Sequence, residues 1–191
     1  MNKMTPHHRQ RKDRLFCNNG FTLMELLFVI AIIGILASVV VLSVLQGREA
    51  AYLSKAKQEL ANINVALQLY SSDNNGNYPP DVFRDIPPGL EEYLAPEAWP
   101  NAAWPGSVFD WENWDDPDTG EKIYQISIRF CEIGDSSNCR FPNRDWADDF
   151  DHESAVFYCV SGACRSYIHQ PPDHPGYCTN CTEHQYPYGI Y

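Results

Sequence analysis

The sequence predicts an α+β fold in which a long N-terminal α-helix, half transmembrane and half amphipathic, packs on a small antiparallel β-sheet head. Three observations support this expectation: an apolar run from Phe21 to Leu45, a stripe of apolar residues at helical spacing directly after it, and short alternating segments towards the C-terminus. A chain of 191 residues accommodates one modest globular domain besides the apolar run.

The charge of the chain changes sign at the start of the apolar run. Residues 1–20 hold five Lys or Arg and one Asp, a net charge of +4, whereas the remainder holds nine Lys or Arg and 24 Asp or Glu, a net charge of −15. The acidic majority lacks the basic patch that nucleic-acid binding requires, so we expect no direct nucleic-acid partner. The positive-inside rule places the basic N-terminus in the cytoplasm.

The apolar run is long enough to cross a membrane, because residues 21–45 would span about 37 Å against a hydrocarbon core of about 30 Å. A secretory signal peptide has an apolar stretch of only about 7–15 residues. An ordinary anchor explains the length but not Glu25, since an acid costs about 2.5–3.5 kcal/mol at the centre of a spanning helix and less near its ends. Cleavage between Gly20 and Phe21 would place a new α-amine four residues before Glu25, where the two charges can neutralise each other.

The segment Gly20-Phe21-Thr22-Leu23-Met24-Glu25, followed by an apolar run containing Gly34, resembles the class III signal of type IV pilin-like proteins. The resemblance implies that a prepilin peptidase cleaves after Gly20 and N-methylates Phe21. It also implies that Glu25 pairs with the terminal amine of an adjacent subunit during filament assembly. Many family members carry a helix-breaking proline at the position of Leu42, so here we expect a continuous helix.

The second half of the helix is expected to be an amphipathic spine over residues 46–76. Its apolar residues recur three or four positions apart: Leu53, Ala56, Leu60, Ile63, Leu67 and Tyr70. The run Asp73-Asn74-Asn75-Gly76-Asn77 should end the helix, because Gly and Asn tolerate the left-handed turn. Residues 66–80, with this turn and a following Tyr-Pro, resemble the pseudopilins of type II secretion.

The head is expected to occupy residues 77–191. Residues 78–120 predict a loop packed by tryptophans, with one short helix from Leu90 to Leu94. Alternation over residues 124–130 predicts a half-buried strand. Residues 155–160 and 164–168 flank Ser161-Gly162 and predict a β-hairpin.

Six cysteines lie in the head and one, Cys17, lies in the leader, which predicts disulfides in an oxidising compartment. The predicted hairpin would bring Cys159 opposite Cys164 at a bridgeable distance. The remaining candidates are Cys131 with Cys139, which enclose a compact loop, and Cys178 with Cys181. The alternative is a four-thiolate zinc site made by Cys159, Cys164, Cys178 and Cys181, which we expect less than disulfides.

Two acidic segments, residues 114–121 and 145–153, are candidate calcium sites. Neither matches the EF-hand pattern, and the candidate ligands in the first segment are Asp115, Asp116 and Asp118. The resemblance to pseudopilins, which often hold calcium in a C-terminal loop, adds weight to a calcium site. Solvated turns are the simpler expectation, so we predict no required cofactor. His152 lies between two acids but lacks a nucleophile at any recognisable spacing, and we expect no enzyme.

The sequence therefore predicts a structural subunit of a type IV pilus-like filament. Its parts are a cleaved cytoplasmic leader (1–20), a transmembrane and assembly helix (21–45), a helical spine (46–76) and a head (77–191). The resemblance implies a single-pass inner-membrane precursor, a filament in the periplasm or at the cell surface, and an assembly platform with its ATPase as a partner. The alternatives are a type II secretion pseudopilin and a minor tip pilin whose head binds a ligand for adhesion or DNA uptake.

Overall fold

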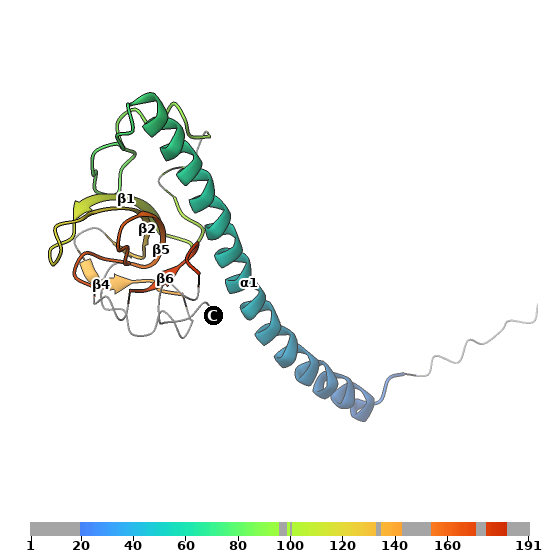
Figure 1. The fold of residues 1–191 in the computed structure, drawn as a ribbon. Helices are drawn as coiled ribbons and strands as arrows, with labels where there is room; N and C mark the ends of the chain where they lie inside the picture. The colour runs from blue at the N-terminus through green and yellow to red at the C-terminus, as the bar shows by residue number, and fades with distance from the viewer. Residues whose placement is uncertain are drawn as a thin grey trace, which may run out of the picture. The chain divides into compact units, whose positions relative to one another are not determined.

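The computed structural model describes residues 20–95, 99, 101–132, 135–142, 154–170 and 175–182. The chain forms two compact units, Met1–Val44 and Leu45–Tyr191. One helix, α1, runs without interruption from Leu23 to Asp73 and contributes residues to both units (Figure 1). The continuous helix expected from the absence of proline is therefore confirmed.

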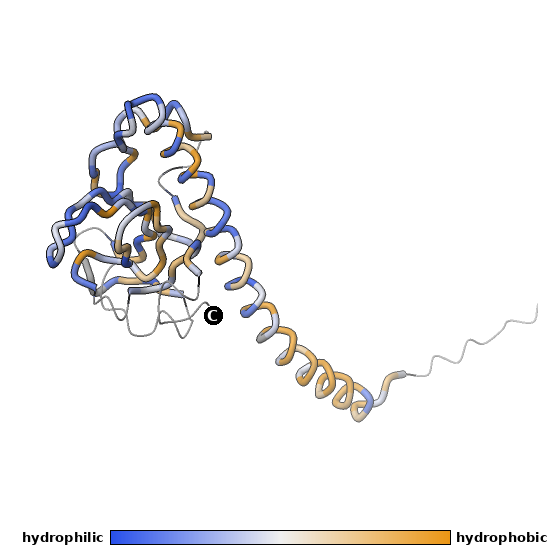
Figure 2. Tube along the Cα trace, in the orientation of Figure 1, coloured by the Kyte–Doolittle hydropathy of each residue, from blue (hydrophilic) through white to orange (hydrophobic). Residues whose placement is uncertain are grey.

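The part of α1 in the first unit is apolar and exposed. Figure 2 shows this stretch as a nearly unbroken hydrophobic tube. Within the described residues, α1 is the one helix long and apolar enough to cross a membrane, and none of its most apolar window is buried. The side chains described in this unit are all exposed, so the apolar surface they form requires lipid or protein around it.

The part of α1 in the second unit carries the predicted apolar stripe. Ala56, Leu60, Ile63 and Leu67 are buried in the main core, and Leu53 and Tyr70 are partly buried against it. Helical spacing places all six on one face, which packs on the sheet. The amphipathic spine is therefore confirmed.

The C-terminal end of α1 is a Schellman-type cap. The N–H of Gly76 donates to the carbonyl of Ser71 at 2.8 Å, and the backbone of Asn75 is left-handed with φ 58°. The helix thus ends at Asp73, inside the Asp-Asn-Asn-Gly segment that predicted its end.

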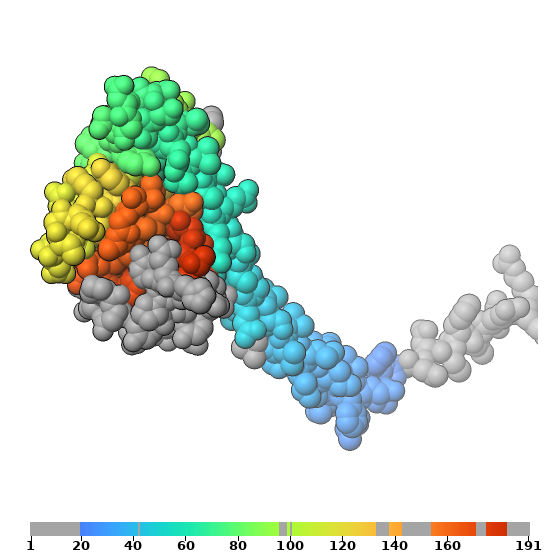
Figure 3. Space-filling model, viewed as in Figure 1, coloured from blue at the N-terminus to red at the C-terminus, as the bar shows by residue number. Residues whose placement is uncertain are grey.

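The head contains a four-stranded sheet and a separate two-stranded one. The first has the order β1 (Val108–Asp115), β2 (Lys122–Arg129), β5 (Ser154–Ser161), β6 (Tyr177–Cys178); the second pairs β3 (Cys131–Glu132) with β4 (Asp135–Cys139). β1, β2 and β5 are antiparallel, whereas the short β6 pairs with β5 in parallel, so the sheet is mixed. Figure 3 shows β5 and the segment after it beside the second-unit part of α1.

Strand β1 corrects the prediction of a loop over residues 78–120. It pairs with β2 along its whole length, with Phe109 opposite Ile128 and Trp111 opposite Ile126. Asp110 and Glu112 occupy alternate positions of β1, and acidic residues are depleted in strands. Their presence made the period-two pattern difficult to recognise in the sequence. The short helix expected over Leu90–Leu94 is also absent, and hydrogen-bonded turns take its place.

Strand β2 is buried on both faces, which corrects the prediction of a half-buried strand. Ile126 and Ile128 face α1 and are fully buried, but Gln125 and Ser127 on the other face are fully buried as well. The segment that follows β5 covers this polar face. A polar residue is buried at little cost when its hydrogen bonds are satisfied, so alternation alone did not reveal the second layer.

The predicted hairpin over residues 155–168 is wrong in its second strand. After Ser161 and the left-handed Gly162 (φ 95°) the chain leaves β5, and residues 164–168 form no strand. The N–H of Arg165 donates to the side-chain oxygen of Gln125 at 2.9 Å, and the Gln125 amide donates back to the Arg165 carbonyl. The side-chain amide of Gln125 in β2 thus forms the backbone hydrogen bonds of Arg165 that a neighbouring strand would form in a hairpin.

Candidate functional site

The N-terminal end of α1 holds the residues expected to act in processing and assembly. Gly20 and Phe21 precede the helix and are exposed, with Phe21 80% accessible. A protease can reach a peptide bond only where the backbone is extended and accessible, and the Gly20–Phe21 bond lies outside the helix. The structure therefore places the expected cleavage point at an accessible position.

Glu25 takes part in a capping box with Thr22. The Glu25 carboxylate accepts hydrogen bonds from the backbone N–H of Thr22 at 2.9 Å and from its hydroxyl at 2.8 Å. The Glu25 N–H donates in turn to the Thr22 hydroxyl oxygen at 3.2 Å. These reciprocal bonds satisfy donors that the first turn of any helix leaves without partners.

Thr22 is a residue of this site that the sequence analysis overlooked. The signal was present, because Thr22-Leu23-Met24-Glu25 has the Ser/Thr-x-x-Glu spacing of a capping box before an apolar run. The capping box gives Glu25 a role within its own helix, and Glu25 would have this role in a plain membrane anchor as well. Both hydrogen bonds from Thr22 end on the same carboxylate oxygen, Oε2.

The surface next to Glu25 is a continuous apolar one. Large side chains more than half exposed cover this first part of α1: Leu23, Met24, Leu26, Leu27, Phe28, Ile30, Ile32, Ile33, Ile35, Leu36, Val39, Val40 and Val41. A monomeric soluble protein rarely exposes so large a contiguous apolar surface. The site at the helix start thus combines one acid with a surface suited to lipid or to other helices.

The structure joins six cysteines in three disulfides: Cys131 to Cys139, Cys159 to Cys164, and Cys178 to Cys181. These are the pairs that the sequence analysis considered first. The Cys159–Cys164 pair forms across the turn after β5, with α-carbons 5.5 Å apart, although the predicted hairpin is absent. All four sulfurs of the alternative zinc site are engaged in disulfides, which leaves that set no thiolate to bind the metal.

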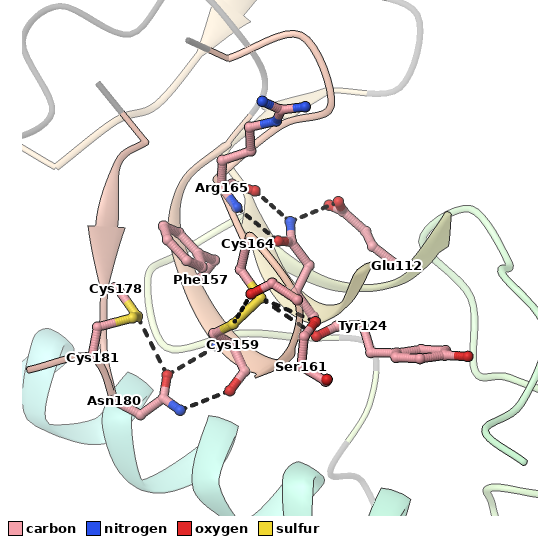
Figure 4. The surroundings of a disulfide bond; sticks show 12 residues. Glu112, Tyr124, Phe157, Cys159, Ser161, Cys164, Arg165, Cys178, Asn180 and Cys181 are labelled. Atoms are coloured by element: carbon pink, nitrogen blue, oxygen red, sulfur yellow. Dashed lines mark hydrogen bonds between the residues drawn. A yellow bond between two sulfur atoms is a disulfide. The ribbon is translucent and has the colours of Figure 1, made fainter. Parts of the chain in front are cut away.

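Asn180 connects the last two disulfides. Its side-chain oxygen accepts from the Cys159 N–H at 2.9 Å, and its amide donates to the Cys159 carbonyl at 2.8 Å (Figure 4). These bonds lie two positions beyond the last parallel pair of β5 and β6, which is Phe157 with Cys178. The Cys178–Cys181 loop is thereby held to the edge of the sheet.

The polar face of the sheet contains a buried network centred on Arg129. Its guanidinium lies 2.6 Å from Asp110 Oδ2 and 2.8 Å from Glu112 Oε1, and all three side chains are at most 6% exposed. Glu112 also accepts from Trp114, Gln125 and Ser127. Burial raises the pKa of Glu112, and the charge of Arg129 opposes this rise.

The three calcium candidates do not converge. Asp116 is buried and accepts from the N–H groups of Asp118 and Thr119 at 2.8 and 3.1 Å, while its Oδ2 lies 2.9 Å from the Arg165 guanidinium. Asp115 instead pairs with Lys122 at 3.1 Å on the surface. Among the described residues no group of three or more His, Cys, Asp or Glu is arranged to hold a metal ion, and the acidic segment 145–153 lies outside them.

Asp116 should make folding stability depend on acid pH. Burial alone would raise its pKa, but the N–H groups of Asp118 and Thr119 and the Arg165 charge hold it below the ordinary value of 3.8. Its stabilising contribution is therefore complete above that value and is lost as the pH falls through the lower, folded-state pKa. We expect the Asp116→Asn variant to melt below the wild type at neutral pH, and the difference to shrink as the pH falls below 3.8.

The measurement is the melting temperature of both full-length proteins in detergent across a pH series. Asp115→Asn is the matched control, because Asp115 forms only an exposed ion pair. A melting difference for Asp116→Asn that stayed constant from neutral to acid pH would contradict the assigned ionisation.

Comparison with known proteins adds to this geometry. Residues 15–41 match the family described as the prokaryotic N-terminal methylation motif, which confirms the resemblance carried by Gly20 to Glu25. Relatives named type II secretion system core protein G are 43% identical over 60 residues in Pectobacterium carotovorum subsp. carotovorum, 44% over 61 residues in Aeromonas hydrophila and 38% over 84 residues in Klebsiella pneumoniae.

These matches concern the N-terminal region of the chain. They cover 31%, 32% and 44% of this chain and 38%, 42% and 56% of the three relatives, so this chain spans about half or less of the length of the relatives it matches. No solved structure matches the chain significantly. The similarity therefore concerns the start of α1 and part of the spine. It does not extend to the disulfide-bonded part of the head.

Proposed function

We propose that this protein is a structural subunit of a type IV pilus-like filament, polymerised through the first half of α1. The observation that carries the proposal is the methylation motif of residues 15–41, which extends into the first part of α1, where none of the most apolar window is buried. Lipid would cover this surface in the precursor, and neighbouring α1 helices would cover it in the filament. Van der Waals packing between helices would replace contacts with lipid tails, and outside the bilayer the exclusion of water from the apolar surface would hold the helices together.

Processing would create the group that Glu25 needs. In the precursor, Thr22 satisfies the carboxylate locally. We propose that a prepilin peptidase cleaves after Gly20 and methylates Phe21, and that the new ammonium of one subunit pairs with Glu25 of the next. An unpaired charge inside a bundle of apolar helices is penalised, so this contact would set the register between subunits.

Among filament types, a type II secretion pseudopilus is the one that a specific observation favours. The relatives in three organisms carry the name of that system's core protein. We propose a precursor anchored in the inner membrane with its N-terminus in the cytoplasm, assembled with pilin-like subunits by a membrane platform and its ATPase. The oxidising side of that membrane suits a head with three disulfides.

The proposal assigns no catalytic step and no nucleic-acid contact to this subunit. The buried carboxylates Asp110, Glu112 and Asp116 each accept hydrogen bonds from the protein's own donors, which is the arrangement of structural acids. The acidic charge of the chain after residue 20 would repel a phosphate backbone.

The test is the intact mass and N-terminal sequence of the protein purified from its native membrane without reducing agent. We expect a chain that begins at N-methyl-phenylalanine 21 and whose mass is lower, by six hydrogen atoms, than that of the fully reduced chain, because three disulfides are present. A chain that keeps residues 1–20, or one cut within the apolar run, would refute the processing and return the protein to a plain anchored or secreted domain.

A further inference from the structure

The face of α1 opposite the core carries an exposed apolar pair in the second unit. Val65 is 57% and Leu69 51% exposed, whereas Ile63 and Leu67 beside them are fully buried. The two exposed residues are one helical turn apart and so lie on one face. Single exposed apolar residues need no explanation, but a pair beside an apolar groove indicates a surface that another molecule covers.

A groove of about 310 Å³ lies next to this pair. Its lining residues are Glu59, Asn62, Ile63, Val65, Tyr93, Leu94 and Ala95. Acidic residues lie next to the lining residue Tyr93: its hydroxyl donates to Asp73 at 2.9 Å, and its sequence neighbours Glu91 and Glu92 are exposed. The groove is thus lined mostly by apolar and aromatic residues, with Glu59 and Asn62 among them and further acids next to Tyr93.

The opposite flank of α1 carries the complementary charge. At 3.6 residues per turn, Lys57 lies roughly opposite to Glu59 and Asn62, which line the groove. Lys57 is exposed, and its ammonium lies 5.4 Å from the centre of the Tyr177 ring. One flank of the helix is therefore apolar with an acidic edge, and the other presents a cation next to an aromatic ring.

We propose that the groove lined by Val65, together with the exposed Leu69 next to it, receives a second copy of this chain. The second copy would bind through the flank of its own α1 that bears Lys57. The inference rests on the proposed filament and assigns its head-level contact. Two different surfaces of one chain form a heterologous contact, which is the type that builds an open filament rather than a closed dimer. Lys57 and Asp73 lie about 24 Å apart along α1. Two copies shifted by about this distance along the helix axis would place Lys57 of one copy at the height of Asp73 of the other.

The experiment compares filament yield for full-length variants in cells that contain the assembly machinery. We expect Val65→Asp with Leu69→Asp to lower the yield at least tenfold, because it places one charge in the lining of the groove and a second on the exposed apolar face next to it. Phe83→Asp is the matched control, since Phe83 is 56% exposed and lies away from the groove. Each variant must accumulate as processed, disulfide-bonded protein in the membrane, which separates assembly from folding.

A charge exchange tests the partner directly. Lys57→Glu should lower the yield at least fivefold, and adding Glu91→Lys with Glu92→Lys should restore it to within about twofold, since opposite charges would meet again. Lys122→Glu, at an exposed pair on the β1–β2 turn, should leave the yield unchanged. Normal yield of the Val65/Leu69 variant, or failure of the exchange to restore assembly, overturns this inference and leaves the filament proposal standing. A wild-type protein that forms no filament overturns both.

Discussion

The Glu25→Ala variant should be processed normally and remain in the membrane without entering filaments. The proposed α-ammonium of a neighbouring Phe21 would then be buried among apolar helices without its partner. Breaking such a buried pair costs about 3–5 kcal/mol, which corresponds to a fall of 100-fold or more in the association constant of one contact. The measurement is the amount of sheared filament relative to processed protein in the membrane.

Thr22→Val separates the two roles of Glu25. This variant loses the hydroxyl that shares the capping box but keeps the carboxylate and the Thr22 backbone donor. Loss of a cap typically costs about 1 kcal/mol, so filament yield should fall far less than with Glu25→Ala. Equal losses from the two variants would mean that Glu25 serves only to cap the helix, and normal assembly of Glu25→Ala would refute the register contact outright.

The Arg129→Met variant should lose most of the stability of the head. It leaves Asp110 and Glu112 buried without their counter-charge, where removing one partner of a buried ion pair costs about 3–5 kcal/mol. We expect the melting temperature of the full-length protein in detergent to fall by roughly 10 °C or more, measured by tryptophan fluorescence.

Two further variants show whether the loss comes from buried charge. Lys122→Met removes an exposed pair, with side chains 48% and 66% accessible, and should cost less than about 1 kcal/mol. Glu112→Gln added to Arg129→Met should recover part of the loss, because it removes one of the two uncompensated charges. An Arg129→Met loss no larger than that of Lys122→Met would contradict the role given to the network.

Features set by neighbouring residues could be predicted from the sequence. The processing segment, the length of α1, its buried stripe and its end all depend on residues within a few turns of one another. The Cys159–Cys164 pair was predicted from the register of a hairpin that does not form. The pair is present all the same, because five positions and a glycine turn bring the two sulfurs together. The hydrogen bonds between Thr22 and Glu25 are equally local, and the Thr-x-x-Glu spacing would have predicted them.

Tertiary contacts decided the rest of the head. Strand β1 exists because Arg129 on the neighbouring strand neutralises Asp110 and Glu112, so that residues with low strand propensity lie in the middle of a sheet. The segment after Gly162 leaves β5 because the Gln125 side chain satisfies its backbone. Strand propensity and the alternation of apolar and polar residues describe only what each residue prefers by itself. A charged or polar side chain becomes a core residue only when a distant part of the chain supplies its hydrogen-bond or ion-pair partner.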